Sequence, residues 1–311
     1  MKRLLMVFTP LLFCLPAFSP ANAWEPTKPI EIVVGFAPGG GSDQSARLIA
    51  GAAQELFPVP LVVNNKPGAG GVLAATQFVN LPADGYSLLV AGGSDTTSVP
   101  AHRKVPYKDF TSIIRLTNNP FFLIVNKDSP YHSVEDVIKA AKEKPGSIAL
   151  GNAGVGTLAH SIGLILEKSA GIKLKHVPYQ GGAPTIQALV AGQIDVAAGA
   201  TEEIEGQVQA GTVRVLAATS AERSGHYPDV PTLKERGFDV VITNMKGLVA
   251  PLGLPQEIVD YLHDHFHKAM ENPKWQEYSK RVGEPTNYQN AKDFHASQVE
   301  QLERVRAAIG K

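Results

Sequence analysis

The apolar positions of the chain fall into short runs that alternate with stretches of helical spacing. Ile30 to Val34 is a run rich in β-branched residues, which predicts a strand. After a glycine-rich turn, apolar residues recur at helical spacing from Ala46 to Leu56. The same order of strand, turn and helix continues along the chain, as in βαβ units, and no fixed-period repeat interrupts it. The pattern therefore predicts an α/β protein.

The same apolar patterns predict the later strands and helices. Ser133 offers an N-cap for a helix that runs to about Lys142. We expect further strands at 61–63, 87–91, 121–125, 148–150, 196–198, 213–217, 240–243 and 247–250, and further helices at 72–79, 158–169, 184–191, 255–270, 273–282 and 291–309. The order of these elements predicts two lobes. Lobe 1 takes residues 24–118 and 244–311, and lobe 2 takes residues 119–243. The last three helices are expected to cover lobe 1 from outside.

The first 23 residues have the order of a secretory signal peptide. Two basic residues at positions 2 and 3 precede an apolar stretch at 4–18, and small residues at 21–23 suit a signal peptidase. A membrane anchor is the alternative, but the stretch is shorter than the roughly 20 residues of a span and contains two prolines. Lipidation of Cys14 is disfavoured because a bulky residue precedes it. We expect cleavage after Ala23 and a periplasmic protein.

Composition narrows the function classes. Removing the first 23 of 311 residues leaves 288, a length that fits one large domain or two ordinary lobes, and removes the single cysteine. The mature chain then cannot use disulfides. Its 27 basic residues against 29 acidic ones give a net charge near −2, so nothing in the charge favours nucleic acid or an anionic membrane as a partner.

Three glycine-rich loops, at residues 38–43, 151–157 and 179–185, each lead into a predicted helix. A helix start has backbone N–H groups without intrahelical partners and a partial positive charge, so a glycine loop there lets an anion approach closely. Each loop alone is a weak signal, because tight turns also need glycine. The first loop has neither the lysine of a nucleotide P-loop nor a dinucleotide fingerprint. We interpret the three loops as an anion site between two lobes.

Other candidate chemistry is sparse. His160 lies on one helical face with Thr157, but no neighbouring acid or nucleophile completes a triad. The histidines at 263, 265 and 267 have a spacing of two, which points to different faces of a helix rather than to one metal site. Asp43 fits a first-turn residue favoured by the helix dipole better than a ligand contact. We therefore predict no catalytic residues, no metal and no cofactor.

Eight motifs resemble one family in order along nearly the whole mature chain, the substrate-binding receptors of tripartite tricarboxylate transporters, also called the Bug family. The motifs are Lys28-Pro29-Ile30, Pro38-Gly39-Gly40-Gly41-Ser42-Asp43, Asn65-Lys66-Pro67-Gly68-Ala69-Gly70-Gly71, Pro106-Tyr107-Lys108-Asp109-Phe110, Gly154-Val155-Gly156-Thr157-Leu158-Ala159-His160, Val177-Pro178-Tyr179-Gln180-Gly181, Gly192-Gln193-Ile194-Asp195 and Pro228-Asp229-Val230-Pro231-Thr232. The resemblance implies a two-lobed periplasmic binding protein fold of type II with the ligand cleft between the lobes. It also implies a small carboxylate ligand and delivery to membrane permease subunits. We expect a monomer.

The resemblance also implies ligand-binding residues. The first loop and the second loop would bind the ligand's proximal carboxylate, and further residues would shape the rest of the site. Those of the first group are Phe36, Ala37, Pro38, Gly39, Gly40, Gly156 and Thr157; those of the second are Tyr179, Gln180, Gly199, Thr201, Ser94, Thr96 and Thr97, with Asp43 and His160 as neighbouring candidates.

The chain departs from the family pattern at two places. Met245-Lys246 stands where many relatives have an aromatic pair, and Asp95 stands where relatives often have a neutral residue. Lys246 is a candidate partner for a second ligand carboxylate, with a solvated surface lysine as the alternative. Asp95 would accept from a ligand hydroxyl or amine, or cap a turn. The main rival functions are a periplasmic enzyme using Asp43, His160 or Asp195 and a sensor receptor for a signalling protein.

Overall fold

The computed structural model describes residues 24–91, 93–94, 99–102, 110–281 and 286–310. Within them the strands form one ten-stranded sheet whose main path runs β2-β1-β3-β9-β4-β7-β5-β6, with β8 and β10 also paired to β4. The strands are β1 Ile30–Val34, β2 Leu61–Asn65, β3 Ser87–Ala91, β4 Thr111–Asn126, β5 Ala149–Asn152, β6 Lys175–Pro178, β7 Val196–Ala200, β8 Val213–Ala218, β9 Thr243–Ala250 and β10 Thr286–Asn290.

The helices follow the strands as the apolar pattern predicts, with α3 and α7 as additions. They are α1 Gly41–Ala53, α2 Val72–Phe78, α3 Val99–His102, α4 Val134–Glu143, α5 Leu158–Ala170, α6 Gly182–Val190, α7 Thr201–Gln209, α8 Gln256–Ala269, α9 Pro273–Arg281 and α10 Ala291–Ile309, with short 3₁₀ turns at Gln54–Leu56 and Ala69–Gly71. No helix in the described part of the chain has both the length and the apolar character that crossing a membrane requires.

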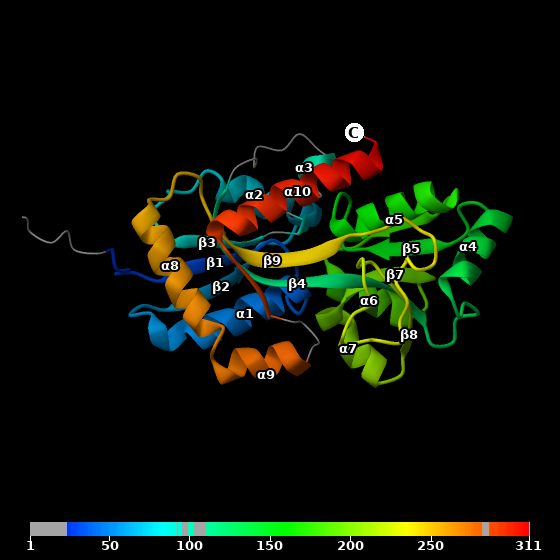
Figure 1. The fold of residues 1–311 in the computed structure, drawn as a ribbon, viewed down its shortest axis with the longest axis horizontal. Coiled ribbons are helices and arrows are strands. Elements are labelled where there is room, and N and C mark those ends of the chain that lie inside the picture. The colour runs from blue at the N-terminus through cyan, green and yellow to red at the C-terminus, as the bar shows by residue number, and fades with distance from the viewer. Residues whose placement is uncertain (1–23, 92, 95–98, 103–109, 282–285, 311) are drawn as a thin grey trace, which may run out of the picture.

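Two lobes share the long strand β4 (Figure 1). Its first half pairs antiparallel with β9 and β10, and its second half, from Phe121 onward, pairs antiparallel with β7 and β8. The first lobe also contains β1, β2 and β3, and the second contains β5 and β6. This two-lobed α/β architecture agrees with the fold that the sequence resemblance implies. The exact residue bounds of the lobes stay a prediction.

Each lobe has its own buried apolar core. One cluster in the first lobe surrounds Ile32, Ile49 and Trp275 under α1, α8 and α9, and one in the second surrounds Leu123, Leu150 and Ile162 under α4 and α5. Burying side chains of this size stabilises a fold by about 1.5–3 kcal/mol each, so each lobe is stabilised by a core of its own.

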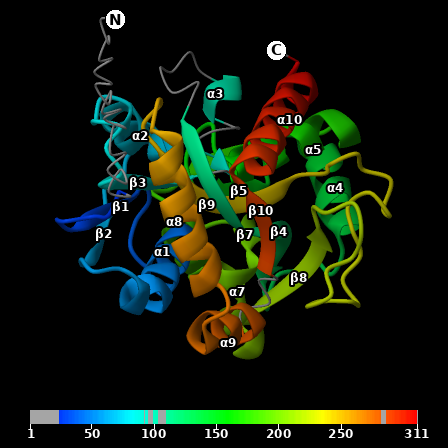
Figure 2. The same ribbon diagram turned by 60° about the vertical axis from the view of Figure 1, so that its left-hand side comes forward.

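The C-terminal helix α10 differs from expectation. It was expected to cover lobe 1 only, but it lies across both lobes (Figures 1 and 2). Phe294, near its start, packs in a first-lobe cluster, whereas Val305, near its end, is fully buried in the core of the second lobe. The single helix α10 therefore packs against both lobes on one side of the protein.

Candidate functional site

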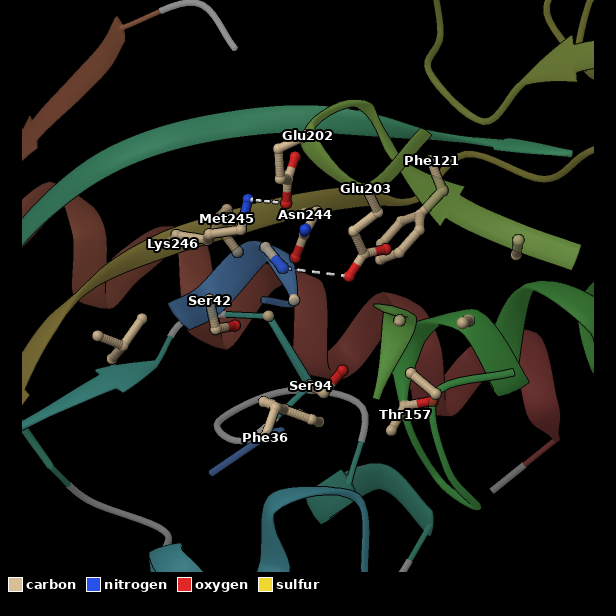
Figure 3. A pocket seen from close by; sticks show the side chains of 18 of the residues that line it. Phe36, Ser42, Ser94, Phe121, Thr157, Glu202, Glu203, Asn244, Met245 and Lys246 are labelled. Carbon is tan, nitrogen blue, oxygen red and sulfur yellow. Dashed lines mark hydrogen bonds and ion pairs between the residues drawn. The ribbon is translucent and has the colours of Figure 1, made fainter. Parts of the chain in front are cut away.

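A small cavity of about 50 Å³ lies between the lobes. It opens at the carboxyl ends of strands from both lobes, which is where α/β proteins commonly bind ligands. Phe36 follows β1, Ala91 ends β3, and Ala153 follows β5. Figure 3 shows the cavity from close by. Its lining residues are Phe36, Gly40, Gly41, Ser42, Val90, Ala91, Gly93, Ser94, Phe121, Ala153, Thr157, Ala159, Gly182, Ala198, Glu202, Glu203, Asn244, Met245 and Lys246.

Asp43 fixes the first glycine loop onto α1. Gly39 has φ +82°, a left-handed conformation that favours glycine, and its N–H donates to Asp43 Oδ2 at 2.9 Å. Arg47, one turn further on, donates from Nε to Asp43 Oδ1 at 3.0 Å and also binds Asn65. Asp43 therefore holds the loop that leads into the cavity, and both of its carboxylate oxygens accept hydrogen bonds from the protein itself.

The charge state of Asp43 follows from these contacts. Burial of the carboxyl acts to raise its pKa, but the hydrogen bond from Arg47, the Gly39 N–H and the contact with Asn65 together outweigh burial. The pKa of Asp43 is held below its ordinary value. Asp43 is thus an ionised structural anion and lacks the raised pKa that a general acid needs at neutral pH.

A carboxylate of the protein itself sits where helix starts from both lobes converge. The Gly41 N–H, in the first turn of α1, donates to Glu203 Oε1 at 3.3 Å. The Ala200 N–H, at the start of α7, donates to Glu203 Oε2 at 3.0 Å. Glu203 also lies close to Gly182, the first residue of α6, where an added Cβ would lie 1.8 Å from Glu203 Oε1. Glu203 therefore occupies the place where these helix starts converge, and an anion site for a ligand stays a prediction.

Lys246 and Glu202 form a buried ion pair between the lobes. Lys246 Nζ lies 2.5 Å from Glu202 Oε1, and the two side chains are 3% and 0% exposed. Lys246 comes from β9 of the first lobe and Glu202 from α7 of the second. The alternative that Lys246 is a solvated surface lysine is therefore wrong. Its predicted contact with a ligand carboxylate stays a prediction.

The glycines at the start of α1 and α6 make room for these two acids. A Cβ on Gly41 would lie 1.8 Å from Glu202 Oε1, and a Cβ on Gly182 would lie 1.8 Å from Glu203 Oε1. The conformation at Gly41 and Gly182 does not itself require glycine, since neither has a positive φ. Close approach of a carboxylate is therefore the physical reason for glycine at both positions.

The second glycine loop joins the lobes on the other side of the cavity. Thr157 caps α5 by accepting from the His160 N–H, and its hydroxyl donates to Gly154 O at 2.7 Å. The Leu158 N–H donates to Ser94 Oγ of the first lobe at 3.0 Å. A Cβ on Gly154 would come within 3.0 Å of the Cα of Gly70. The two backbones touch here, which places the start of α5 against the first lobe.

The predicted ligand-binding residues fall into three groups in the structure. Phe36, Gly40, Ser94, Thr157 and Lys246 line the cavity. Asp95, Thr96 and Thr97 lie outside the described residues. The remaining candidates lie around the cavity without lining it, and these are Ala37, Pro38, Gly39, Asp43, Gly156, His160, Tyr179, Gln180, Gly199 and Thr201. Their roles toward a ligand stay predictions.

Some of the third group have clear structural roles. His160 Nδ1 accepts from the Gly156 N–H at 3.2 Å and so closes its own loop. Gly199 faces Ile204 and Ile186, where a Cβ would clash at 2.6 and 2.9 Å. Tyr179 packs against the apolar cluster under α6. These contacts account for the three residues as parts of the cavity's supporting wall.

The acids and histidines of the rival enzyme do not converge. Asp43 binds Arg47, His160 binds the Gly156 N–H, and Asp195 accepts from the Ala149 N–H at 2.7 Å at an exposed strand end. None of the three lines the cavity. Among the residues with described positions, no group of three or more His, Cys, Asp or Glu side chains is arranged to hold a metal ion.

The sequence reasoning missed Glu202, Glu203, Ser42 and Asn244 as cavity residues. The signal for the two acids was present. Glu202 and Glu203 follow the predicted strand at 196–198 within a few residues, and acidic residues are typical of the first turn of a helix, where the dipole favours them. A helix after this strand would have placed both carboxylates at a helix start.

Comparison with known proteins places this architecture in a family. The model of the tripartite tricarboxylate transporter family receptor matches residues 45–311. The chain belongs to this receptor family. The UPF0065 protein in the gbd 5′ region of Cupriavidus necator is 34% identical to the receptor over 303 residues, which are 96% of this chain and 92% of that protein.

Solved structures agree with the family. The periplasmic binding protein BugD has a TM-score of 0.84 and 31% identity, covering 91% of this chain and 96% of that one. MatC from Rhodopseudomonas palustris, with bound malate, has a TM-score of 0.86 and 27% identity, covering 91% of this chain and 99% of that one. The receptor is thus similar to extracytoplasmic solute-binding proteins, and the family is one of receptors and not of enzymes.

Proposed function

We propose that this receptor is exported through a signal peptide cleaved after Ala23, captures a small carboxylate between its lobes and delivers it to the permease of a tripartite tricarboxylate transporter. The observation that carries the proposal is the position of the Glu203 carboxylate. Backbone N–H groups from both lobes, at Gly41 and Ala200, already donate hydrogen bonds to a carboxylate there. The bound malate of MatC supports the same ligand class.

The lobes supply a mechanism for presenting the ligand. A ligand that contacts both lobes favours the closed state by its differential affinity for that state. The cavity of about 50 Å³ is far smaller than the roughly 300 Å³ or more of ordinary ligand pockets, so entry of a ligand requires the lobes to separate. The permease then recognises the closed, loaded form. No catalytic step is proposed, since Asp43, His160 and Asp195 lie apart from the cavity.

A thermal-shift panel of mono-, di- and tricarboxylates, amino acids and aromatic acids tests the proposal. A ligand at a hundred times its Kd stabilises the folded state by about 2.7 kcal/mol, which is easily measured. The recovered ligand should be chemically unchanged by mass spectrometry. Turnover of a stabilising compound would contradict the receptor role, and loss of ligand uptake in cells that lack the receptor gene checks delivery to the permease.

A further inference from the structure

Helix α8 places two histidines on one face, apart from the cavity between the lobes. His263 and His267 are four residues apart, which makes them neighbours on the helix surface, and their ring centroids lie 5.6 Å apart. The argument from a spacing of two holds for His265, whose ring stacks on Tyr261 with centroids 3.9 Å apart. The structure therefore brings together two of the three histidines that this spacing assigned to different faces.

The ring of His263 is oriented by an acid on one side and a phenol on the other. Its Nδ1 lies 2.8 Å from Asp264 Oδ1, and its Nε2 lies 2.9 Å from Tyr288 Oη. An ionised carboxylate only accepts, so in the neutral imidazole Nδ1 donates to Asp264 and Nε2 accepts from the Tyr288 hydroxyl. Histidines that bind metal ions are held in this way, with the second ring nitrogen donating to a carboxylate. The lone pair of Nε2 is thus directed toward the phenol oxygen.

Tyr288 contacts both histidines from β10, which lies beside α8 (Figure 2). Its ring stacks on that of His267 with centroids 4.2 Å apart. Two atoms that bind one zinc ion at about 2.0–2.1 Å and at neighbouring positions lie about 3 Å from each other. The separation of 2.9 Å between His263 Nε2 and Tyr288 Oη matches that value. Tyr288 is 38% exposed, so an ion can reach the phenol from solvent.

The charge around the phenol also favours a cation. The carboxylates of Asp264 and Asp293 both act electrostatically on Tyr288. Among the residues with described positions, no third His, Cys, Asp or Glu side chain joins the two histidines in a metal-binding arrangement. The third side-chain ligand is then the oxygen of Tyr288, a residue type outside those four.

We propose that His263, His267 and Tyr288 bind one divalent transition-metal ion on lobe 1. His263 contributes Nε2, and the partly buried His267 side chain turns to contribute a ring nitrogen. The ion takes the place of the Tyr288 hydroxyl proton, which passes to water, and water fills the other positions. Imidazole ligands suit Zn²⁺, Ni²⁺ and Cu²⁺, whereas Mg²⁺ and Ca²⁺ prefer oxygen alone. The site replaces the expectation of no metal, and none of its three residues lines the cavity.

Calorimetric titration of the receptor, prepared without a histidine tag, tests the site with Zn²⁺ and with Mg²⁺ as the comparison. One equivalent of Zn²⁺ should bind and Mg²⁺ should not. His263→Gln and His267→Gln should each weaken Zn²⁺ binding at least about tenfold, because losing even a residue that only orients a ligand costs about 10–100-fold. His265→Gln, on the same helix, should leave the affinity unchanged. Undiminished binding in either of the first two variants, or an equal loss in His265→Gln, overturns the site.

The part of Tyr288 has its own readout. A phenolate bound to Cu²⁺ gives a charge-transfer absorption band, which should appear when Cu²⁺ is added to the unaltered receptor and be absent in Tyr288→Phe. Tyr288→Phe should also weaken Zn²⁺ binding at least about tenfold. Unchanged or tighter Zn²⁺ binding in this variant overturns the three-ligand site and makes Tyr288 only a hydrogen-bond partner of His263.

A thermal measurement separates binding from damage to the fold. Because the ion joins α8 to β10, Zn²⁺ should raise the unfolding midpoint of the unaltered receptor and of His265→Gln, and leave that of His263→Gln unchanged. The midpoints without metal show whether each variant is folded. An equal rise in folded His263→Gln overturns the proposal. None of these outcomes bears on the carboxylate function, which the separate panel of acids tests.

Discussion

Lys246 Nζ lies 2.5 Å from Glu202 Oε1, and this pair joins β9 of one lobe to α7 of the other almost out of reach of solvent. The two residues are 44 positions apart in the sequence, and neither lies in one of the three glycine-rich loops. Their contact, together with Glu203 on Gly41, means that the protein's own side chains hold the lobes together across the cavity. Several consequences can be measured.

Removing Lys246 should cost more than removing an exposed cation. In Lys246→Met, the buried carboxylate of Glu202 loses its ion pair with Lys246, and we expect the free energy of unfolding to fall by about 3–5 kcal/mol. Denaturation in urea measures it. Arg304→Ala, in an exposed pair with Glu300, should change it by less than about 0.5 kcal/mol. The double variant Lys246→Met with Glu202→Gln should recover much of the loss; if it does not, the ion pair is not the cause.

Asp43 should make the receptor sensitive to acid. Its pKa in the folded state lies below the ordinary value because of Arg47 and the Gly39 N–H, even though burial opposes the shift. A group with a lowered folded pKa contributes stability above its unfolded pKa and loses that contribution as the pH falls through the folded pKa. Asp43→Asn should therefore lower the unfolding free energy by about 2 kcal/mol at pH 7. The difference from the unaltered receptor should shrink below about pH 4, as thermal unfolding across pH would show. A constant difference would argue against a role for the charge.

Gly41 and Gly51 offer a matched pair of substitutions on α1. A Cβ on Gly41 would enter the space of Glu202, so Gly41→Ala must move that side chain away from Lys246 and should destabilise the fold by about 1–3 kcal/mol. Gly51 has open space around it, and Gly51→Ala should stabilise the helix by about 0.5–1 kcal/mol. Opposite signs in thermal unfolding are expected. Equal effects would mean that Glu202 is not held tightly.

Cleavage after Ala23 would create a new ion pair. The main-chain nitrogen of Trp24 lies 2.6 Å from Glu257 Oε1, and the Trp24 ring packs edge-on against Tyr86 and Tyr261. Once cleaved, this nitrogen is an ammonium facing a carboxylate. The intact mass of the exported receptor should begin at Trp24. Glu257→Gln should then lower its unfolding free energy by less than about 1 kcal/mol. A different mature N-terminus would contradict the predicted cleavage.

The sequence predicted most of the elements because their signals are local. The helix over Ala291–Ile309 has the expected bounds, and Ser133 caps α4 as predicted, by accepting a hydrogen bond from the Asp136 N–H at 3.2 Å. Strands that form through pairing with distant segments were harder to predict from the sequence. The first half of β4 has many polar residues and is a strand because β9 and β10 flank it, which no local pattern reveals. β10 was missed for the same reason.

For the cavity, too, local features were predicted and features that depend on long-range contacts were not. The glycine loops predicted where the cavity lies, because that depends on helix starts and backbone geometry, and their preference for a ligand anion stays a prediction. The occupant was not predicted, because it depends on α7, whose apolar spacing is thin, meeting α1 from the other lobe. Lys246 was noticed as unusual in its position, but its burial depends on a partner that only the tertiary fold supplies.

The strand that carries Lys246 is also one of the two that cross between the lobes. β9 pairs with β4 from Thr243, opposite Pro120, to Ala250, opposite Thr111, and Lys246 lies three residues past that crossing. Any rotation of the lobes about β4 and β9 must swing Lys246 relative to Glu202. The crossing between the lobes and the interlobe ion pair therefore lie on one short piece of backbone. Substitutions that change the backbone at this crossing should also move Lys246 relative to Glu202, so the geometry of the crossing and the strength of the ion pair cannot vary independently.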